Sequence, residues 1–491
     1  MVVPLGSLQL VVPESIAANR RVLATMHMVR FDLVPWPGRL SVAGNCVSLL
    51  RNVGHSGMVL LAYPVPGYGE VTLRTGTLPE RPTPYHLPIE LARGTLDRLR
   101  NQMSLWSESG LVVPPPIIEQ TDRAVERFSA ALFLETDPER QTAAADECLA
   151  ICCPLIDALC REFAQQFRQI GKHDSHREPG LGIRITPEQF SSTWLAELDP
   201  AFRYVEVAGW SGSEFDPDDD HVSPTEIQTL VAASHRRSMI GPLWDAGPRG
   251  LPDRINQIQE FDRKRIEALQ YFGQLLSDIR VQPDWLHIAS GLNGVGHRFL
   301  SFPQQIQLVV DLQHLVDEFN RDVPVLISFA QPWGERLAWS VGGAQGIQIA
   351  DLLLRNDIRL SGFGLEFDLD YWPNGSLLRD PLQWLDLVDT WAQFGMPLFI
   401  FLRAPSGYTA DQVAGDASDR TPTIRASFGE TQLCQHLAHV TSLLLARPVV
   451  EAIIWSEWRD SPESEYPAAG LADAQGHPKA LYHHLRSTMP R

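Results

Sequence analysis

From Gly180 to the C-terminus, short apolar runs alternate with longer amphipathic stretches. Runs of about four to eight apolar residues are typical of buried parallel strands, and the intervening stretches are long enough for helices. Each run is therefore predicted to be a strand that is followed by a helix. The runs are eight in number: Leu181–Ile185, Tyr204–Ala208, Met239–Leu243, Trp285–Ala289, Val325–Phe329, Leu360–Phe367, Leu398–Leu402 and Ala452–Trp455.

Helix-start signals lie between the runs. Ser223–Glu226 has the residues of a capping box with proline at the first helical position, and Ser301–Gln304 and Asp380–Gln383 repeat the pattern. A doubly wound sheet would need a glycine-rich phosphate turn after its first strand, and Ile185–Pro187 offers none. The alternation therefore predicts an α/β fold with a (β/α)8 TIM barrel over residues 180–491.

The first part of the chain has a different pattern. Arg21–Phe31 and Met58–Tyr63 are rich in Val, Leu and Met, and Gly, Pro and Asn clusters separate them. Short strands at this spacing predict a small β-rich, sandwich-like domain over residues 1–112, of a kind that can bind carbohydrate. Residues 113–179 are predicted to be a helical connector that ends in the polar stretch Lys172–Pro179, which is typical of a linker.

Composition and charge limit the classes of function and partner that the sequence can have. Hydrophobic residues make up 44% and charged residues 20%, as in a folded globular protein. The net charge of −18 disfavours nucleic acid and anionic membranes as partners. Met1–Pro4 lacks the basic stretch of a secretory signal, so a cytoplasmic location is expected. Four cysteines between Cys148 and Cys160 are expected to be buried thiols rather than metal ligands, and no metal or cofactor is predicted. The oligomeric state stays open.

In barrels of this kind the active site lies at the C-terminal ends of the strands. Tryptophans and carboxylates recur at those positions, which is typical of a site for an oligo- or polysaccharide. For Trp455 the alternative is a packing residue at the barrel floor. The predicted carboxylates are Asp245, Glu335, Glu366, Asp368 and Glu457. The predicted sugar-binding residues are Trp210, Trp244, Gln331, Trp333, Trp372, Trp455, Trp458 and Arg459.

The sixth predicted strand carries the densest group of carboxylates. Alternation places Glu366, Asp368 and Asp370 on one face, toward the barrel mouth, and Leu365, Phe367 and Leu369 on the other, under the helices. Mutual repulsion is expected to raise the pKa of one carboxyl group, as a general acid requires. The alternative is a structural ion-pair network with Arg336, Arg403 or Arg459.

Three segments carry a resemblance to a known family. Arg359–Glu366 resembles the sixth-strand motif I-x-G-I/V-G-x-Q of the family-10 glycoside hydrolases, the endo-β-1,4-xylanases. Ala452–Asp460 resembles the eighth strand of that family with its tryptophan, and Gly470–Tyr482 resembles the closing motif G-L-x-D-x-x-G-x-P-K-P-A-Y. The resemblance implies a TIM barrel and hydrolysis of a xylan-type β-linked polysaccharide.

The chain departs from that family at both usual catalytic glutamates. Ser290 stands where the resemblance implies the acid/base glutamate after the fourth strand, and Leu402 stands where it implies the nucleophile. A hydroxyl and an isobutyl group cannot replace two carboxylates in glycoside hydrolysis. The standard mechanism of the family is therefore in doubt.

Three hypotheses follow from this departure. The first is a glycosidase with relocated carboxylates, in which Glu366 is the general acid and Glu335, near the solvent, is the base or nucleophile, although the two could exchange roles. The second is a catalytically inactive barrel that binds carbohydrate or a protein partner. The third, a metal-dependent hydrolase, is the weakest because no pair of histidines lies near the rim at ligand spacing.

Overall fold

The computed structural model describes residues 6–134, 137–171, 179–186, 189–190, 192–208, 224–247, 250–293, 300–339, 344–356, 358–371, 375–406, 430–461, 464 and 466–489. The predicted linker Lys172–Pro179 therefore lies almost wholly outside the described residues. Ser223, the cap expected for the first barrel helices, lies outside them as well.

The N-terminal part contains two four-stranded sheets that share an apolar core. The first sheet has the order β4-β5-β1-β8 and the second β3-β2-β6-β7. Two short helices, α1 (Glu14–Ala17) and α2 (Arg20–Thr25), follow β1. The strands are β1 (Gly6–Val11), β2 (His27–Val29), β3 (Pro35–Trp36), β4 (Gly38–Ala43), β5 (Cys46–Arg51), β6 (Met58–Val65), β7 (Gly69–Arg74) and β8 (Tyr85–His86).

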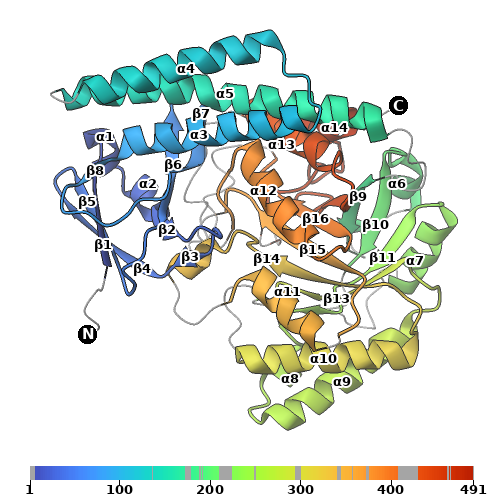
Figure 1. Cartoon of the computed structure of the whole chain (residues 1–491). Coiled ribbons are helices and arrows are strands. Elements are labelled where there is room, and N and C mark those ends of the chain that lie inside the picture. The colour runs from blue at the N-terminus through green and yellow to red at the C-terminus, as the bar shows by residue number, and fades with distance from the viewer. Residues whose placement is uncertain are drawn as a thin grey trace.

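Three long helices follow the sheets and pack against one another: α3 (Leu87–Glu108), α4 (Pro115–Phe133) and α5 (Pro138–Gly171). Their apolar faces close the core of the N-terminal sheets, and the cysteines of α5 are buried in it. The same core includes Leu385 and Leu443 from the barrel helices α12 and α13. Figure 1 shows α5 running across both parts of the molecule. The helices thus cover both parts, whereas the boundaries at 112 and 179 stay predictions.

Eight parallel strands form a closed barrel, and all eight predicted runs lie on them. The order runs from β11 through β10, β9, β17, β16, β15 and β14 to β13, and pairing of β11 with β13 closes the ring. A short strand, β12 (Trp244–Asp245), adds to the end of β13. The barrel strands are β9 (Gly180–Ile185), β10 (Phe202–Val207), β11 (Arg237–Ile240), β13 (Trp285–Ser290), β14 (Val325–Ala330), β15 (Gly362–Asp368), β16 (Leu398–Arg403) and β17 (Val450–Trp455).

Helices follow the strands around the barrel, and the prediction of a TIM barrel preceded by β-rich structure is confirmed. Ser301 and Gln304 form the predicted capping box, and Asp380 accepts a hydrogen bond from the Gln383 amide (3.1 Å). No helix in the described part of the chain is both long and apolar enough to cross a membrane. The helices are α6 (Ser192–Glu197), α7 (Pro224–Ala233), α8 (Asp253–Asn256), α9 (Phe261–Asp278), α10 (Phe302–Phe319), the 3-10 helix η2 (Glu335–Ala338), α11 (Gly346–Arg355), α12 (Pro381–Ala392), α13 (Glu430–Leu444) and α14 (Ala480–Ser487).

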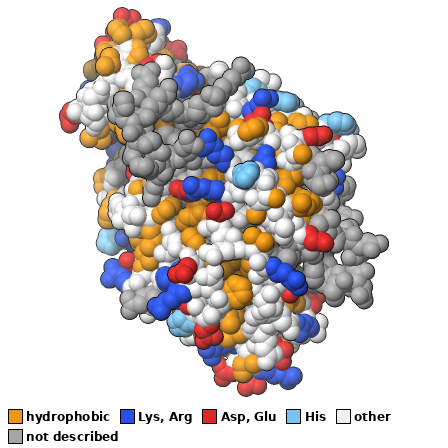
Figure 2. Space-filling model, turned by 90° about the vertical axis from the view of Figure 1, so that its right-hand side faces the viewer, with side chains coloured by type: hydrophobic (Ala, Val, Ile, Leu, Met, Phe, Trp, Pro, Cys, Tyr) orange, Lys and Arg blue, Asp and Glu red, His pale blue; other side chains and the backbone are white. Residues whose placement is uncertain are grey.

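The barrel has an outer and an inner apolar layer. The outward faces of the strands pack under the helices, and Leu365, Phe367 and Leu369 of β15 lie there as predicted. Apolar side chains also fill the lower barrel interior, where Tyr204, Phe399 and other residues form a small cluster. On the outside, acidic, basic and apolar side chains are interspersed over the described part of the face beside α6 and α7 (Figure 2). The charge of −18 is therefore not gathered on that face.

A buried ion pair joins the N-terminal part to the barrel. Arg98 of α3 binds the carboxylate of Asp380, which is wholly buried at the start of α12. Burial alone would raise the pKa of Asp380, but Arg98 and the Gln383 hydrogen bonds outweigh it and lower the pKa. A second link is the hydrogen bond that the Gln383 side chain donates to the Thr72 carbonyl (2.7 Å).

We expect Arg98→Met to lower the free energy of unfolding by about 3–5 kcal/mol, because it leaves Asp380 as an unpaired buried charge. Adding Asp380→Asn should recover part of that loss, since asparagine is uncharged and still caps a helix. Denaturant unfolding of the single and double variants measures both effects. Arg93→Met is the matched control, because Arg93 lies on the same helix with a side chain that is 46% exposed. Equal losses in R98M and R93M would contradict the prediction.

Candidate active site at the barrel mouth

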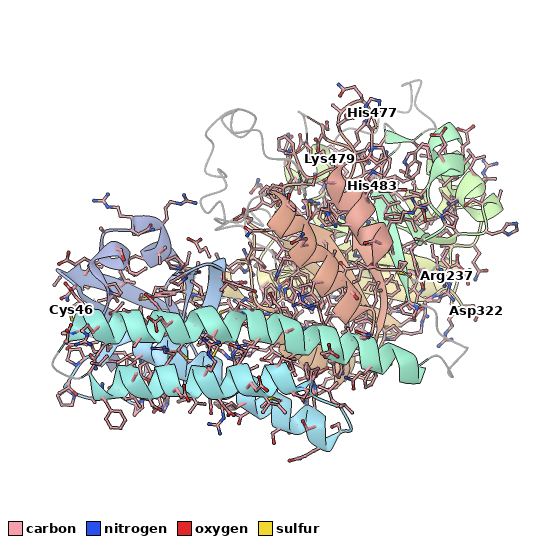
Figure 3. All side chains as sticks on the ribbon, turned by 90° about the horizontal axis from the view of Figure 1, so that it is seen from above. Cys46, Arg237, Asp322, His477, Lys479 and His483 are labelled. Carbon is pink, nitrogen blue, oxygen red and sulfur yellow. The ribbon has the colours of Figure 1, made fainter. Side chains whose placement is uncertain are left out.

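The C-terminal ends of the strands form one rim of the barrel. Lys479 lies at this rim, where it pairs with Asp460 (2.5 Å), whereas Arg237, the first residue of β11, and Asp322, before β14, lie at the opposite end (Figure 3). Inward-facing positions near the rim carry polar and charged side chains above the apolar cluster of the lower barrel. The candidate site is built from these side chains.

A continuous series of polar contacts crosses the barrel from β9 to β15. Arg184 pairs with Glu206 (2.5 Å), and the other oxygen of Glu206 lies 2.7 Å from His287 Nδ1. His287 Nε2 lies 2.7 Å from the Ser328 hydroxyl, which in turn contacts Oε1 of Glu366. Five strands thus contribute to one hydrogen-bonded path that ends at a carboxyl group in the mouth.

Close packing brings Ser328 and Glu366 together. Gly364 lies on the same face of β15 as Glu366, and a Cβ atom there would lie 2.5 Å from Cβ of Ser328 and 2.7 Å from the Phe401 ring. Only glycine leaves room for both neighbours. The ring of Phe401 also stacks on His287, with centroids 5.2 Å apart, and lies under the guanidinium of Arg184. The Phe401 ring therefore packs against two residues of the hydrogen-bonded path.

Burial acts to raise the pKa of both Glu366 and Glu206, but their partners give the two groups opposite net shifts. The pKa of Glu366 is raised, first by burial and to a smaller extent by Asp368, although Arg184, Ser328 and His287 act against the rise. For Glu206, burial alone would raise the pKa, but Arg184 and His287 outweigh it and the pKa is lowered. A carboxyl group with a raised pKa was expected on this strand, and it is Glu366. The main cause of the raised pKa is desolvation rather than repulsion between carboxylates.

Only one oxygen of Glu366 is occupied. Oε1 accepts hydrogen bonds from the Gly291 amide (3.1 Å) and the Ser328 hydroxyl. Oε2 has no hydrogen-bond partner among the described residues, and the side chain as a whole is partly exposed. Hydrogen bonds to Oε1 thus fix the orientation of the Glu366 carboxyl group, and Oε2 is left without a partner in this part of the structure.

The next layer outward is centred on Arg403. It pairs with Asp368 (2.8 Å), lies 3.5 Å from Glu457, and its guanidinium is 4.1 Å from the centre of the Tyr466 ring. The Tyr466 hydroxyl donates to the other oxygen of Asp368 (3.0 Å), and the Tyr466 ring meets Tyr371 edge-on. Asp368 and Glu457 thus take part in structural ion pairs, and their partner is Arg403.

Glu335 differs from the expectation. Its side chain is wholly buried in η2 and pairs with Arg379 (3.0 Å), whose guanidinium also lies 4.6 Å from the Trp333 ring. Strand β14 ends at Ala330, and the turn through Gly334, in a left-handed conformation, carries Glu335 away into the protein. The expectation that Glu335 meets solvent at the mouth is therefore wrong, and it has no access to a bound sugar in this structure.

Four of the predicted sugar-binding tryptophans pack in the interior instead. Trp244 and Trp455 are at most 1% exposed, and Trp333 and Trp458 are 5% exposed. Each belongs to the core between strands and helices, and Trp455 donates its indole hydrogen to the Ala469 carbonyl (2.7 Å). Trp455 is therefore a packing residue, but it lies in the outer core and not at the barrel floor. A strand's last residues alternate between faces, and these four side chains face outward or fold under a loop. Trp210 and Trp372 lie outside the described residues.

The remaining predicted residues are spread along the rim. Asp245 lies beside Ser290 in the β12–β13 pairing and accepts a hydrogen bond from the Gly247 amide (2.8 Å). Gln331 is buried and donates to the Gly375 carbonyl (3.0 Å), so it supports a loop. Arg459 is partly exposed and pairs by backbone with Ala472. Leu402 faces the outer core, which leaves Arg403 as the inward residue at the end of β16.

Sequence reasoning did not identify the inner partners Arg184, Glu206, His287 and Ser328. A signal for them was present, because each is a polar residue within a mainly apolar strand: Gly180–Ile185, Phe202–Val207, Trp285–Ser290 and Val325–Ala330. A polar residue in a run that is buried on both faces must have a partner. Among the described residues no group of three or more His, Cys, Asp or Glu side chains could hold a metal ion.

Comparison with known proteins identifies no family for this chain. No known family model matches the sequence, and no curated protein matches it. The structure is similar to xylanase 10B from Thermotoga petrophila RKU-1 in complex with xylobiose, with 12% identity, 67% of this chain and 96% of that chain covered, and a TM-score of 0.46. Native xylanase 10B from Thermotoga maritima (11%, 63% and 94%, 0.46) and the Ignisphaera aggregans GH53 catalytic domain (14%, 64% and 96%, 0.46) are similar to the same degree.

The raised pKa of Glu366 predicts a pH-dependent change in stability. A carboxyl group whose pKa is higher in the folded than in the unfolded chain stabilises the fold at low pH, and that contribution is lost as pH rises through the folded pKa. Glu366→Gln removes the ionisation and keeps an acceptor for Gly291. We therefore expect the melting temperature of E366Q relative to wild type to increase from pH 4 to pH 8.

Thermal unfolding across that range measures the difference. Glu451→Gln is the matched control at the other end of the barrel, where the substitution removes an ion pair with Arg237 (2.8 Å). E451Q is expected to show no such gain. A constant offset between E366Q and wild type at every pH would refute the proposed environment of Glu366.

Proposed function

We propose that this protein is a glycoside hydrolase that acts on a β-linked oligo- or polysaccharide and uses Glu366 as its general acid. The observation that carries the proposal is the state of Glu366: burial raises its pKa, while one oxygen is held by Gly291 and Ser328 and the other has no hydrogen-bond partner among the described residues. A general acid must be protonated near the working pH and must reach the leaving oxygen. Both requirements are supported by this arrangement.

Asp368 is the proposed base. It lies two residues beyond Glu366 on the same face of β15, so the two backbone positions are about 6.6 Å apart along the strand. Carboxyl separations of about 6.5–9.5 Å belong to inverting enzymes, in which the base activates a water molecule. Arg403 and Tyr466 hold Asp368 in position, and Glu457 is a further carboxylate beside Arg403. The proposal therefore favours inversion at the anomeric carbon.

The path behind Glu366 has a supporting role in this proposal. Ser328 connects Glu366 to His287, and His287 is held by Glu206 and Arg184. The path fixes the orientation of the carboxyl group and supplies a route through which its proton can be replaced after transfer. Tyr371 and Tyr466, which meet edge-on at the rim, take the place of the buried tryptophans as surfaces for a sugar ring.

A second candidate is a barrel that binds carbohydrate without cleaving it. The observation that favours it is Arg403, which neutralises Asp368 and Glu457 together, while Glu335 is withdrawn into the interior. A carboxylate held in an ion pair is a weaker base than a free one. Binding by hydrogen bonds and tyrosine rings would remain.

The test is a hydrolysis assay with xylo-, gluco- and manno-oligosaccharides. We expect wild type to cleave at least one of them, and E366Q to lower kcat/KM by about 10²–10⁴-fold, the usual effect of losing a general acid. Asp368→Asn should have a loss in the same range. Because Glu366 must be protonated, kcat/KM of wild type should fall as pH rises through its raised pKa.

E451Q is again the control, because Glu451 lies at the other end of the barrel. This substitution is expected to leave kcat/KM within about twofold of the wild-type value. Equal rates for wild type and E366Q would remove Glu366 from the mechanism. If calorimetry shows binding of a sugar that no preparation cleaves, the second candidate replaces the first. Neither binding nor cleavage across the panel would reject both.

A further inference from the structure

A pocket of about 570 Å³ lies between the N-terminal sheets and η2 of the barrel. Its walls come from α2 and strands β2 to β5, and from Ala338 and Trp339 at the end of η2. Figure 1 shows η2 beside β3, where the two parts of the molecule meet. The volume is within the range of about 300–1,000 Å³ that small-molecule sites occupy. None of its lining residues takes part in the barrel-mouth site.

The floor of this junction pocket is mainly apolar. Leu23, Met26, Met28 and Leu49 line it, and each is less than 9% exposed. His27 is also buried there, and burial lowers its pKa to about 4; Arg379 lowers it further, and only the hydrogen bond with the Thr25 carbonyl acts against this. The imidazole is therefore neutral at pH 7. The floor suits an apolar body.

The pocket carries positive charge, one arginine in its interior and two at its rim. The lining includes three arginines and no acidic residue. Arg51 is buried and already pairs with Glu80 (2.9 Å). Arg20 and Arg39 are exposed, and neither makes an ion pair within the described part of the chain. Two uncompensated guanidinium groups at the mouth of an apolar pocket are unexpected in a chain with a net charge of −18.

Aromatic side chains stand beside this rim. Trp36 is partly exposed, and Trp339, which is 45% exposed, meets the His27 ring edge-on at 5.4 Å. Aromatic faces and methionine side chains favour a flat ring system over a branched polar molecule. A sugar would find few hydrogen-bonding groups on this floor, and inorganic phosphate would leave the apolar walls unfilled.

We propose that the junction pocket binds an aromatic carboxylate, with its ring system against the apolar floor and its carboxylate at Arg20 and Arg39. Charge complementarity supports the anionic end, because arginine recognises carboxylates through two parallel hydrogen bonds. Burial of the ring supplies the remaining affinity. The inference does not depend on the function proposed for the barrel mouth, because the two sites share no residue.

Titration calorimetry with three naphthalene derivatives tests the proposal. The probes are 2-naphthoate, 2-naphthylmethanol and 2-naphthylmethylammonium, which share one ring system and differ in charge. We expect wild type to bind 2-naphthoate at least about tenfold more tightly than the alcohol, the usual gain from hydrogen bonds to a charged group. The ammonium compound should bind more weakly than the alcohol. No binding of 2-naphthoate, or equal binding of acid and alcohol, would overturn the proposal.

Variants locate the site. The double substitution Arg20→Gln and Arg39→Gln should reduce the affinity for 2-naphthoate about tenfold or more and leave the affinity for the alcohol unchanged. A general loss of folding would lower both. Arg30→Gln is the matched control, because Arg30 is an arginine of the same sheet region that pairs with Asp32 and does not line the pocket. If R30Q weakens 2-naphthoate binding as much as the double variant, the assignment to this pocket is wrong.

E366Q separates binding at the junction pocket from the function proposed for the barrel mouth. It should bind 2-naphthoate with the affinity of wild type, whatever its effect on glycoside hydrolysis. Loss of 2-naphthoate binding in E366Q would place the probe in the barrel mouth and overturn the junction pocket as its site. Failure of hydrolysis with intact 2-naphthoate binding would reject only the function of the mouth.

Discussion

The need to pair every charge inside a closed barrel governs the structure. Closing eight strands into a ring leaves an interior that water hardly enters, and the lower part is filled with apolar side chains. A charged group in the barrel interior, next to these apolar side chains, loses its hydration and must have a partner inside the protein. Arg184, Glu206 and His287 satisfy one another, and the path they form continues through Ser328 to Glu366. The pKa of Glu366 is a consequence of this constraint, because it ends the path without a cationic partner in direct contact.

The same constraint acts where the N-terminal part meets the barrel. Asp380 and Glu335 are wholly buried, and each has an arginine partner, Arg98 or Arg379. An arginine from α3 is needed to neutralise the start of a barrel helix, so the two parts complete each other's electrostatics. The helices α3 to α5 also bury barrel side chains in their own core. The N-terminal part and the barrel therefore share buried contacts, and residues of both line the junction pocket.

For chemistry, the mouth divides into two layers with different electrostatics. The inner layer holds a carboxyl group for which burial favours the protonated form, while the outer layer gathers two carboxylates around Arg403. An acid and a base in separate environments are what general acid catalysis requires. The absence of glutamates at Ser290 and Leu402 is then compatible with catalysis by other carboxylates, and the balance between catalysis and binding depends on how firmly Arg403 holds Asp368.

The sequence by itself determined the barrel. Eight apolar runs and the helix caps between them are local signals, and the inward face of β15 follows from alternation along one strand. Glu366 could be assigned to the mouth for that reason. Glu335 and the tryptophans could not be placed correctly, because they lie where strands end and the chain turns, and a shift of one residue moves a side chain from the mouth to the core. The partners of Glu366 come from strands that are far apart in the chain. Only the closed ring brings them together, and the partners that each buried carboxyl group finds there determine whether its pKa is raised or lowered.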